Sequence, residues 1–220
     1  MNTIRLLGAT QLIVFVFGVT GQRLLTLAVG SGSISDKLVN ISNTLTLMRI
    51  SNLVALVERV AIVVLGVLYY SVFNTKYKII ALVAMGLYLA EAITKAVAKI
   101  GAYALIPLSQ EFVEAGAPAS SYFQTLGDFF LYGVDKRGYD IHMLFFCLGG
   151  ILWYYLFYVS GYIPRVLSVW GLAAVCLLSI PTLLVLYNRD FDFIPVMMLA
   201  LPYLPYELFL GVWLIVKGFK

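Results

Sequence analysis

Charged side chains recur inside the apolar stretches of this sequence, where they could bind a small molecule or exchange protons with it. Those that we assign to a site are Arg23, Glu58, Arg59, Glu91, Lys95 and Glu207, and Lys99 extends the helix face of Lys95. A charge at the middle of a bilayer costs about 2.5–3.5 kcal/mol on insertion scales, so such groups usually face a bundle interior or water and pair with one another. We therefore predict that these residues share a polar ligand pocket, open to the outer side of the membrane.

The spacing of these charges supports pairing. Glu91 and Lys95 are four residues apart with the acid first, which is the favourable order for an ion pair within one helix. Glu58 and Arg59 are adjacent, so their side chains leave a helix about 100° apart and could point to different neighbours. The alternative is that such buried pairs fix the register of packed helices and hold no ligand.

Glu207 follows a stretch that contains Pro195, Pro202 and Pro205. Proline interrupts helical hydrogen bonding and frees backbone carbonyls, so we expect a kinked or unwound segment before this acid. Measured from the expected span ends at about 1.5 Å per residue, the charged set lies between the outer half and the midplane of the membrane.

The chain that carries these residues belongs in a bilayer. It has 220 residues, of which 62% are apolar and 12% charged, and its mean hydropathy is +0.95. A soluble domain leaves about 30% of its unfolded surface in water, so lipid must cover so much apolar surface. We predict an all-α, polytopic membrane helical bundle.

Runs of about 20 mostly apolar residues predict the spans. Six occur, at 4–29, 50–73, 78–106, 140–159, 165–187 and 194–216. Segments 34–49 and 119–134 carry apolar residues at helical spacing with a polar opposite face, which predicts two amphipathic interfacial helices. We expect the first run to be retained, because it exceeds the 7–15 residues of a signal-peptide core. We treat 1–220 as one membrane domain.

Lys and Arg in the short loops predict the topology. With both termini in the cytoplasm, the inner loops carry basic residues and no acid, and most acids, including Asp135, fall in outer loops. We predict a multi-pass protein of the cell (inner) membrane. Tyr69, Trp153 and Tyr154 lie towards predicted span ends, where aromatic rings favour the headgroups.

The sequence lacks the residues that several classes of function require. His142 is the only histidine, so neither a two-histidine haem site nor a His-rich zinc site can form, and its place at a span start predicts a solvated side chain. No basic run exceeds two residues, which argues against nucleic acid as a partner. No nucleotide-binding or hydrolase motif occurs. We expect no cofactor, no metal and no catalytic residue.

Two stretches near the C-terminal end resemble bacterial domain-of-unknown-function family 4386. Residues 158–171 contain Ser-Gly-Tyr-Ile-Pro-Arg, and residues 207–219 end in Trp-Leu-Ile-Val-Lys-Gly-Phe. The resemblance implies a six-span architecture over nearly the whole chain and an acid, here Glu207, before the closing aliphatic run. It implies no activity.

Three functions stay open. The first, which we favour, is binding, sensing or transport of a small molecule or ion by the polar pocket, with lipid as the surroundings. The second is a non-catalytic membrane subunit or scaffold, whose amphipathic helices dock a partner protein. The third is an intramembrane lipid-modifying enzyme with Glu91 or Glu207 as general base, and it lacks a nucleophile or metal set.

Overall fold

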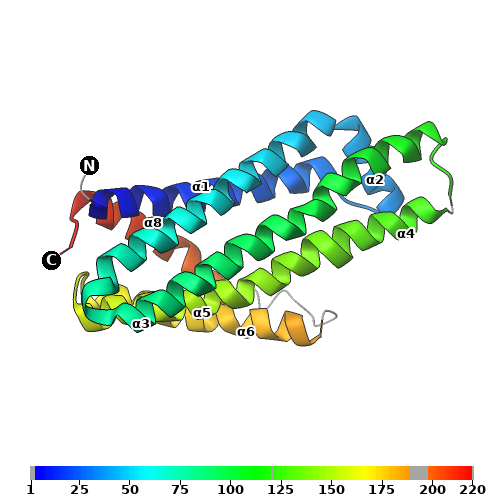
Figure 1. Cartoon of the computed structure of the whole chain (residues 1–220). Helices are drawn as coiled ribbons and strands as arrows, with labels where there is room; N and C mark the ends of the chain where they lie inside the picture. Colours follow the sequence, from blue (N-terminus) through cyan, green and yellow to red (C-terminus); the bar gives the residue numbers. More distant parts are fainter. Residues whose placement is uncertain (1–2, 120, 189–197, 220) are drawn as a thin grey trace. The chain divides into compact units, whose positions relative to one another are not determined.

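The computed structural model describes residues 3–119, 121–188 and 198–219, and these residues contain no strand. The elements in chain order are α1 (Thr3–Val29), α2 (Ile34–Asn43), α3 (Leu45–Glu114), α4 (Tyr122–Asp128), the π-helix η1 (Phe129–Lys136), α5 (Arg137–Ser160), α6 (Arg165–Tyr187), the 3-10 turn η2 (Met198–Ala200) and α8 (Tyr203–Val216) (Figure 1). The prediction of an all-α membrane helical bundle is confirmed.

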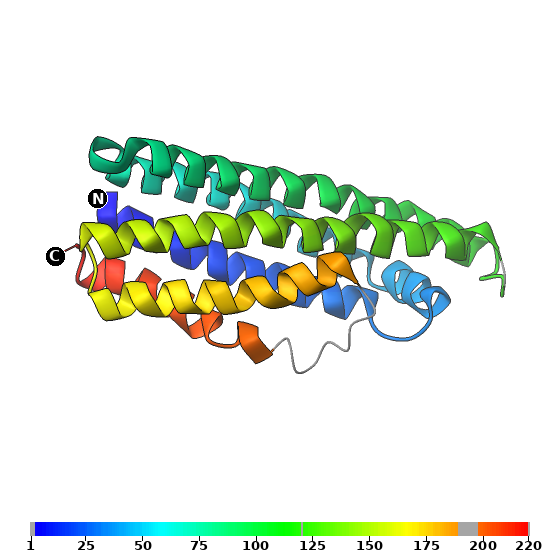
Figure 2. The same ribbon diagram turned by 90° about the horizontal axis from the view of Figure 1, so that it is seen from below.

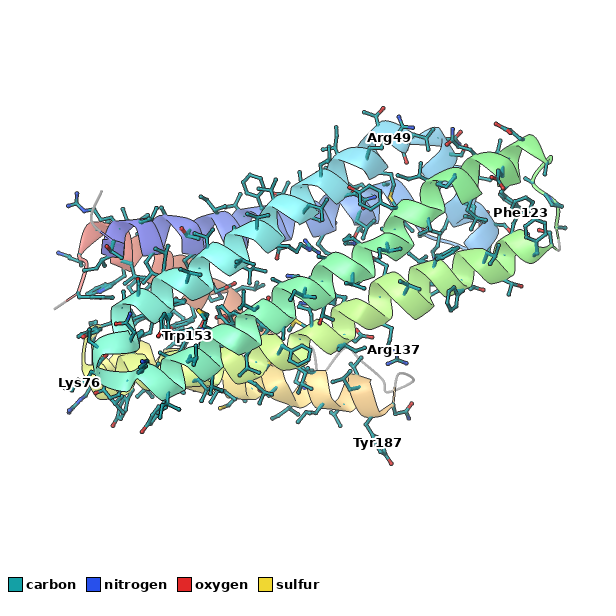
Figure 3. The ribbon with its side chains drawn as sticks, in the orientation of Figure 1. Arg49, Lys76, Phe123, Arg137, Trp153 and Tyr187 are labelled. Carbon is teal, nitrogen blue, oxygen red and sulfur yellow. The ribbon has the colours of Figure 1, made fainter. Side chains whose placement is uncertain are left out.

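The longest element, α3, is a hairpin of two helices. Its 70 residues are interrupted at Tyr77, whose φ of −130° and ψ of 39° are not helical. The chain folds back there, beside Lys76 at the tip of the hairpin (Figures 1 and 3), and the rings of Tyr69 and Tyr88 meet with centroids 6.4 Å apart. The two arms correspond to the predicted spans 50–73 and 78–106.

Four helical stretches are long and apolar enough to cross a membrane: Thr3–Val29, Leu45–Glu114, Tyr122–Ser160 and Arg165–Tyr187. The last predicted span, 194–216, differs. Its helix α8 begins only at Tyr203, after Pro202, and has 14 residues. Such a helix is about 21 Å long, which is shorter than a hydrocarbon core of about 30 Å. Pro195 lies outside the described residues.

The predicted interfacial helix 119–134 is not a separate element. Residues Tyr122–Ser160 form one helical stretch of 39 residues, and the ribbon from α4 to α5 is unbroken in Figure 2. The sequence contains no proline between these bounds, so nothing ends the helix. The π-helical turns of η1 absorb extra residues within the helix.

Contacts divide the chain into two compact units. Unit 1 consists of Met1–Phe15, Val60–Ile93 and Asp140–Lys220, and unit 2 of Val16–Arg59 and Thr94–Tyr139. In unit 1 the start of α1 meets the end of α8, because a Cβ on Gly8 would lie 2.7 Å from the carbonyl oxygen of Gly211. Both ends of the described chain therefore lie at the same end of unit 1.

Unit 1 has an aromatic core. Trp153, labelled in Figure 3, is fully buried and stacks on Tyr69 with ring centroids 4.9 Å apart. Tyr69, Trp153 and Tyr154, three of the rings expected towards span ends, are buried in this core and face other helices. The reason is close helix packing at small residues: a Cβ on Gly149 would lie 2.7 Å from the ring of Tyr88.

In unit 2 the amphipathic segments pack partly against each other. Gly127 of α4 packs on Ile34 of α2, where an added Cβ would lie 2.9 Å from Cγ1. Leu38 and Phe123 are buried in the same apolar cluster. The Nε2 of Gln124 also donates to Ser35 Oγ over 3.1 Å. The rest of the apolar face of 119–134 stays uncovered, because Tyr122, Leu126 and Phe129 are exposed.

Candidate functional site

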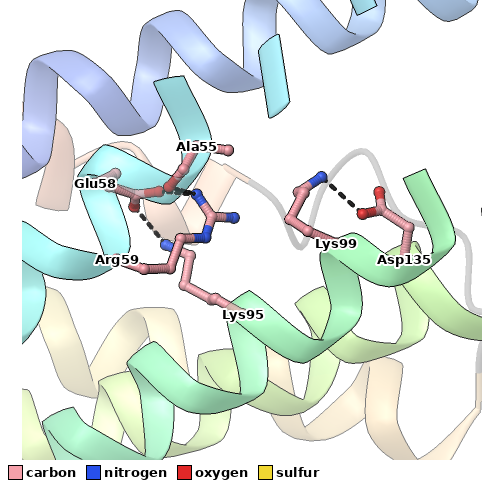
Figure 4. A network of polar contacts seen from close by, with 6 residues as sticks. All are labelled: Ala55, Glu58, Arg59, Lys95, Lys99 and Asp135. Atoms are coloured by element: carbon pink, nitrogen blue, oxygen red, sulfur yellow. Dashed lines mark hydrogen bonds and ion pairs between the residues drawn. The ribbon is translucent and has the colours of Figure 1, made fainter. Parts of the chain in front are cut away.

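The most concentrated set of charges lies in unit 2, around Glu58 on the first arm of α3 (Figure 4). Lys95 Nζ, on the second arm, donates to Glu58 Oε1 over 2.5 Å. Arg59 Nη1 pairs with Glu58 Oε2 and donates to the carbonyl oxygen of Ala55 over 2.6 Å. Glu58 is 4% and Arg59 8% exposed. Both carboxylate oxygens of Glu58 are thus engaged by cations.

This geometry corrects one expectation. Adjacent residues on a helix do not normally face each other, so we expected Glu58 and Arg59 to reach different neighbours. Instead the Arg59 side chain folds back along the helix, as its bond to the Ala55 carbonyl shows. That carbonyl fixes the guanidinium close to Glu58.

Helix α1 approaches the Glu58 carboxylate at a glycine. A Cβ on Gly18 would lie only 3.1 Å from Glu58 Oε1. One turn further along, Gly21 packs against Ala55, where a Cβ would lie 3.5 Å from the backbone nitrogen. Small residues on both helices allow this approach, which excludes bulk solvent from that side of the network.

A second ion pair lies beside the first. Lys99, four residues after Lys95 on α3, donates from Nζ to Asp135 Oδ1 over 2.6 Å (Figure 4). Both side chains are buried. The placement of Asp135 in an outer loop was wrong, because η1 continues the helix into α5 and carries Asp135 against α3. Gly101 makes room, since its Cβ would contact Phe130 O and lie 2.9 Å from the Asp135 nitrogen.

We call the five side chains Glu58, Arg59, Lys95, Lys99 and Asp135 the unit 2 charge network. The predicted site left out Asp135 and also Lys99, which was predicted only as a charge inside the span, on the Lys95 face. The signal for Lys99 was its spacing, because it lies one turn beyond Lys95 on the same face and a buried ammonium requires an anion. Nothing local marked Asp135 as that anion.

Three buried polar atoms near the network have no hydrogen-bond partner among the residues that the structure describes. They are Arg59 Nε and both amide atoms, Nδ2 and Oδ1, of Asn52. Asn52 is 0% exposed. It lies seven residues before Arg59, two helical turns along the same face of α3. Each buried polar group without a partner costs about 1–3 kcal/mol, so packing alone does not account for this amide.

Of the other predicted site residues, Glu91 and Glu207 belong to unit 1. Glu207 is buried in unit 1, where its Oε1 accepts from Gln11 Nε2 over 2.9 Å. Gln11 Oε1 in turn accepts from the Tyr69 hydroxyl over 3.0 Å. Glu91 is also buried in unit 1, whereas Arg23 is exposed on α1. The structure thus brings together three of the six predicted residues, Glu58, Arg59 and Lys95, in unit 2.

The exposure of His142 also differs from the prediction. It is 2% exposed rather than solvated. Because α5 already begins at Arg137 and is continuous with η1, position 142 falls inside a helix and not at a helix start. Among the described residues, no group of three or more His, Cys, Asp or Glu side chains could hold a metal ion.

Comparison with models of known protein families identifies the family of this chain. The model described as Domain of unknown function (DUF4386) matches residues 6–218. The chain belongs to this family. Neither curated proteins nor solved structures give a match. The resemblance drawn from the two C-terminal stretches is confirmed, and the DUF4386 match covers the unit 2 charge network as well as the tail.

The first of those DUF4386 stretches is a helix connection. Gly161 follows α5 with a φ of +69°, a conformation that glycine adopts without strain, and its nitrogen donates to Phe157 O over 3.1 Å. Pro164 is the N-cap of α6. The second stretch begins at Glu207, the acid that accepts from Gln11. The turn is therefore structural, whereas the tail contributes a buried acid to unit 1.

Proposed function

We propose that this member of the DUF4386 family binds a small charged molecule or ion in the cell membrane and transports or senses it. The observation that supports the proposal is the unit 2 charge network, which buries five ionisable side chains. They lie on helical stretches that are long and apolar enough to cross a membrane.

The energetics of buried charge favour a ligand role over a purely structural one. Replacing a buried ion pair by apolar residues of similar volume is often neutral or stabilising, so stability alone does not explain such pairs. Ionisable groups inside membrane helices usually mark the route of a substrate, ion or proton. The proposal includes both termini in the cytoplasm. The shared position of the described chain ends in unit 1 supports one common side, and the Lys and Arg residues of the predicted inner loops favour the cytoplasm.

The scaffold alternative has less support. It relied on amphipathic helices that dock a partner, and the contact of α2 with α4 covers part of their apolar surface. The surface left for a partner is the exposed set Tyr122, Leu126 and Phe129. The enzyme alternative still lacks a nucleophile: Glu207 accepts a hydrogen bond from the Gln11 amide, which is not a nucleophile.

Native mass spectrometry of the purified protein, released from neutral detergent, tests the proposal. The variant is the double substitution Glu58→Gln and Lys95→Met, which removes one acid and one base together. The matched control is Arg49→Gln, because Arg49 is an exposed cation on the same arm of α3 (Figure 3). We expect a small non-protein mass on the wild type and the control, and its loss from the double variant.

Two results would contradict the proposal. One is wild-type protein that carries no small molecule but copurifies with a defined protein, as a scaffold would. The other is equal retention by all three proteins, which would place the ligand away from the charge network.

A further inference from the structure

In the unit 2 charge network, the acids and the bases differ in how many of their hydrogen-bonding atoms have a partner. Glu58 Oε1 accepts from Lys95 and Glu58 Oε2 pairs with Arg59. Asp135 Oδ1 accepts from Lys99. A cationic ligand at Glu58 would therefore have to displace a lysine or arginine of the protein itself. The network also contains three bases and two acids, so it is better suited to an anion than to a cation.

Arg59, in contrast, retains donors. Its Nη1 makes both of its hydrogen bonds, to Glu58 and to the Ala55 carbonyl, and Nε has no partner among the described residues. The edge of the guanidinium formed by Nε and Nη2 points away from those two acceptors (Figure 4). This planar pair of N–H donors matches the spacing of two oxygens on a carboxylate or phosphate.

Asn52 adds a second, independent observation. Its amide is fully buried on the same face of α3, and neither Nδ2 nor Oδ1 has a partner in the described part of the chain. The bond from Arg59 to the Ala55 carbonyl directs the guanidinium back along the helix towards Asn52. An amide can donate to an anion or accept from a hydroxyl of the same molecule.

We infer that the ligand of the unit 2 charge network is an anion with a carboxylate or phosphate group. The Nε–Nη2 edge of Arg59 binds two oxygens of that group, and the Asn52 amide makes a further hydrogen bond to the ligand. The inference rests on the proposed function and names the class of molecule. The same group occurs on free organic acids, on phosphate esters and on anionic lipid headgroups.

Thermal unfolding in neutral detergent, followed by tryptophan fluorescence, tests the inference. The probes are sodium phosphate, sodium octanoate and mixed micelles with phosphatidic acid, each compared with phosphatidylcholine or sodium chloride at equal ionic strength. We expect one of the anionic probes to raise the Tm of the wild type. A response to phosphate or octanoate indicates a free small anion, and a response to phosphatidic acid alone indicates a lipid headgroup.

Arg59→Lys keeps the positive charge beside Glu58 but loses the planar pair of donors. We expect it to weaken binding of the active probe about tenfold, as expected for the loss of one charge-assisted hydrogen bond. Asn52→Leu removes a buried amide without partners, so it should raise the Tm of the free protein and still weaken binding. The control Arg49→Lys changes an exposed arginine in the same way and should bind as the wild type does.

The outcomes separate this inference from the proposed function. If no anionic probe raises the Tm, or if Arg59→Lys and Asn52→Leu bind as tightly as the wild type, the inference is wrong. A neutral or cationic molecule found by native mass spectrometry would overturn the anion assignment and leave the proposed function intact. If Arg59→Lys fails to fold, Asn52→Leu tests the inference alone. Binding of the anionic probe by Asn52→Leu as tightly as by the wild type would then show that the Asn52 amide does not contact the ligand, and the inference would be wrong.

Discussion

The two units bury polar groups by different means. Unit 1 uses hydrogen bonds among hydroxyl, amide and carboxyl groups, such as those from Tyr69 to Gln11, from Gln11 to Glu207 and between the hydroxyls of Tyr154 and Tyr203. Unit 2 uses full charges, as in the Lys99–Asp135 pair. A neutral hydrogen bond contributes about 0.5–1.5 kcal/mol to stability, whereas a buried ion pair must overcome several kcal/mol of desolvation per ion.

This difference indicates different roles for the units. The hydroxyl and amide contacts of unit 1 surround an aromatic core in which Trp153 is fully buried, so they fit a packing role. The charges of unit 2 lie next to a buried amide and an arginine with unused donors. We therefore expect substitutions in unit 1 to change stability alone and substitutions in unit 2 to change binding as well.

The largest expected effect is in unit 2. Lys99→Met leaves the carboxylate of Asp135 buried without its cation, so we expect the free energy of unfolding to fall by about 3–5 kcal/mol. The double substitution Lys99→Met and Asp135→Leu removes both charges and should recover most of that loss. Unfolding in urea or sodium dodecyl sulfate measures both values. Equal stability of the single and double variants would show that the pair is not coupled.

The next effect tests the packing of unit 1. A Cβ on Gly149 would lie 2.7 Å from the buried ring of Tyr88, so Gly149→Ala should destabilise the protein by about 1–3 kcal/mol. Gly86 is the control, because nothing lies within 4 Å of its added Cβ. Gly86→Ala should stabilise its helix by about 0.5–1 kcal/mol. Both variants should bind the ligand as the wild type does. Weaker binding by Gly149→Ala at a temperature where it is folded would contradict the division of roles.

A smaller effect separates two hydroxyls of unit 1. Tyr154 and Tyr203 share a hydrogen bond of 2.7 Å, so Tyr154→Phe leaves the Tyr203 hydroxyl buried without it and should cost about 0.5–1.5 kcal/mol. The Tyr206 hydroxyl is buried and has no partner among the described residues. Tyr206→Phe should therefore leave stability unchanged or raise it. Thermal unfolding of the two variants compares them, and an equal loss would mean that the shared bond is not what stabilises this region.

The sequence predicted the helices better than it predicted their contacts. Apolar runs bounded by charge or glycine are local, and α1, α5 and α6 lie close to their predicted bounds. The rule that buried charges pair predicted ion pairs among the charged residues inside the spans, but it did not predict that Glu58 would pair with both Arg59 and Lys95. Both predictions follow from composition and spacing within one stretch of chain.

What the sequence could not predict depends on distant residues. Asp135 was expected between the interfacial segment 119–134 and the span from 140, and only the continuous helix from α4 to α5 carries it to Lys99. Arg23 was expected in the site because of its depth along α1, but the rotation of that helix leaves it exposed. Trp153 is buried because other helices approach it. Each of these properties is set by how helices rotate and pack, which no local pattern encodes.

The smallest contrast lies within unit 2, between its buried charges and an exposed one at the start of α2. Asp36 forms a capping box with Ser33, accepting from its backbone nitrogen over 2.8 Å and from its hydroxyl over 2.7 Å. These two hydrogen bonds lower the pKa of Asp36 below its usual value of 3.8. The stabilisation of α2 is therefore complete above pH 3.8 and is lost as the pH falls through the lowered pKa.

Hydrogen exchange of the α2 amides in neutral detergent measures this loss. We expect protection of α2 to be constant between pH 7 and 5, after correction for the intrinsic exchange rate, and to fall below about pH 4. Ser33→Ala should reduce protection throughout and move the fall towards pH 3.8, because the carboxylate then lacks its hydroxyl donor. Since Asp36 is exposed, salt and solvent screen its charge, and neither change should alter ligand binding. A parallel loss of binding would mean that α2 takes part in the site, and the contrast between exposed and buried charge in unit 2 would fail.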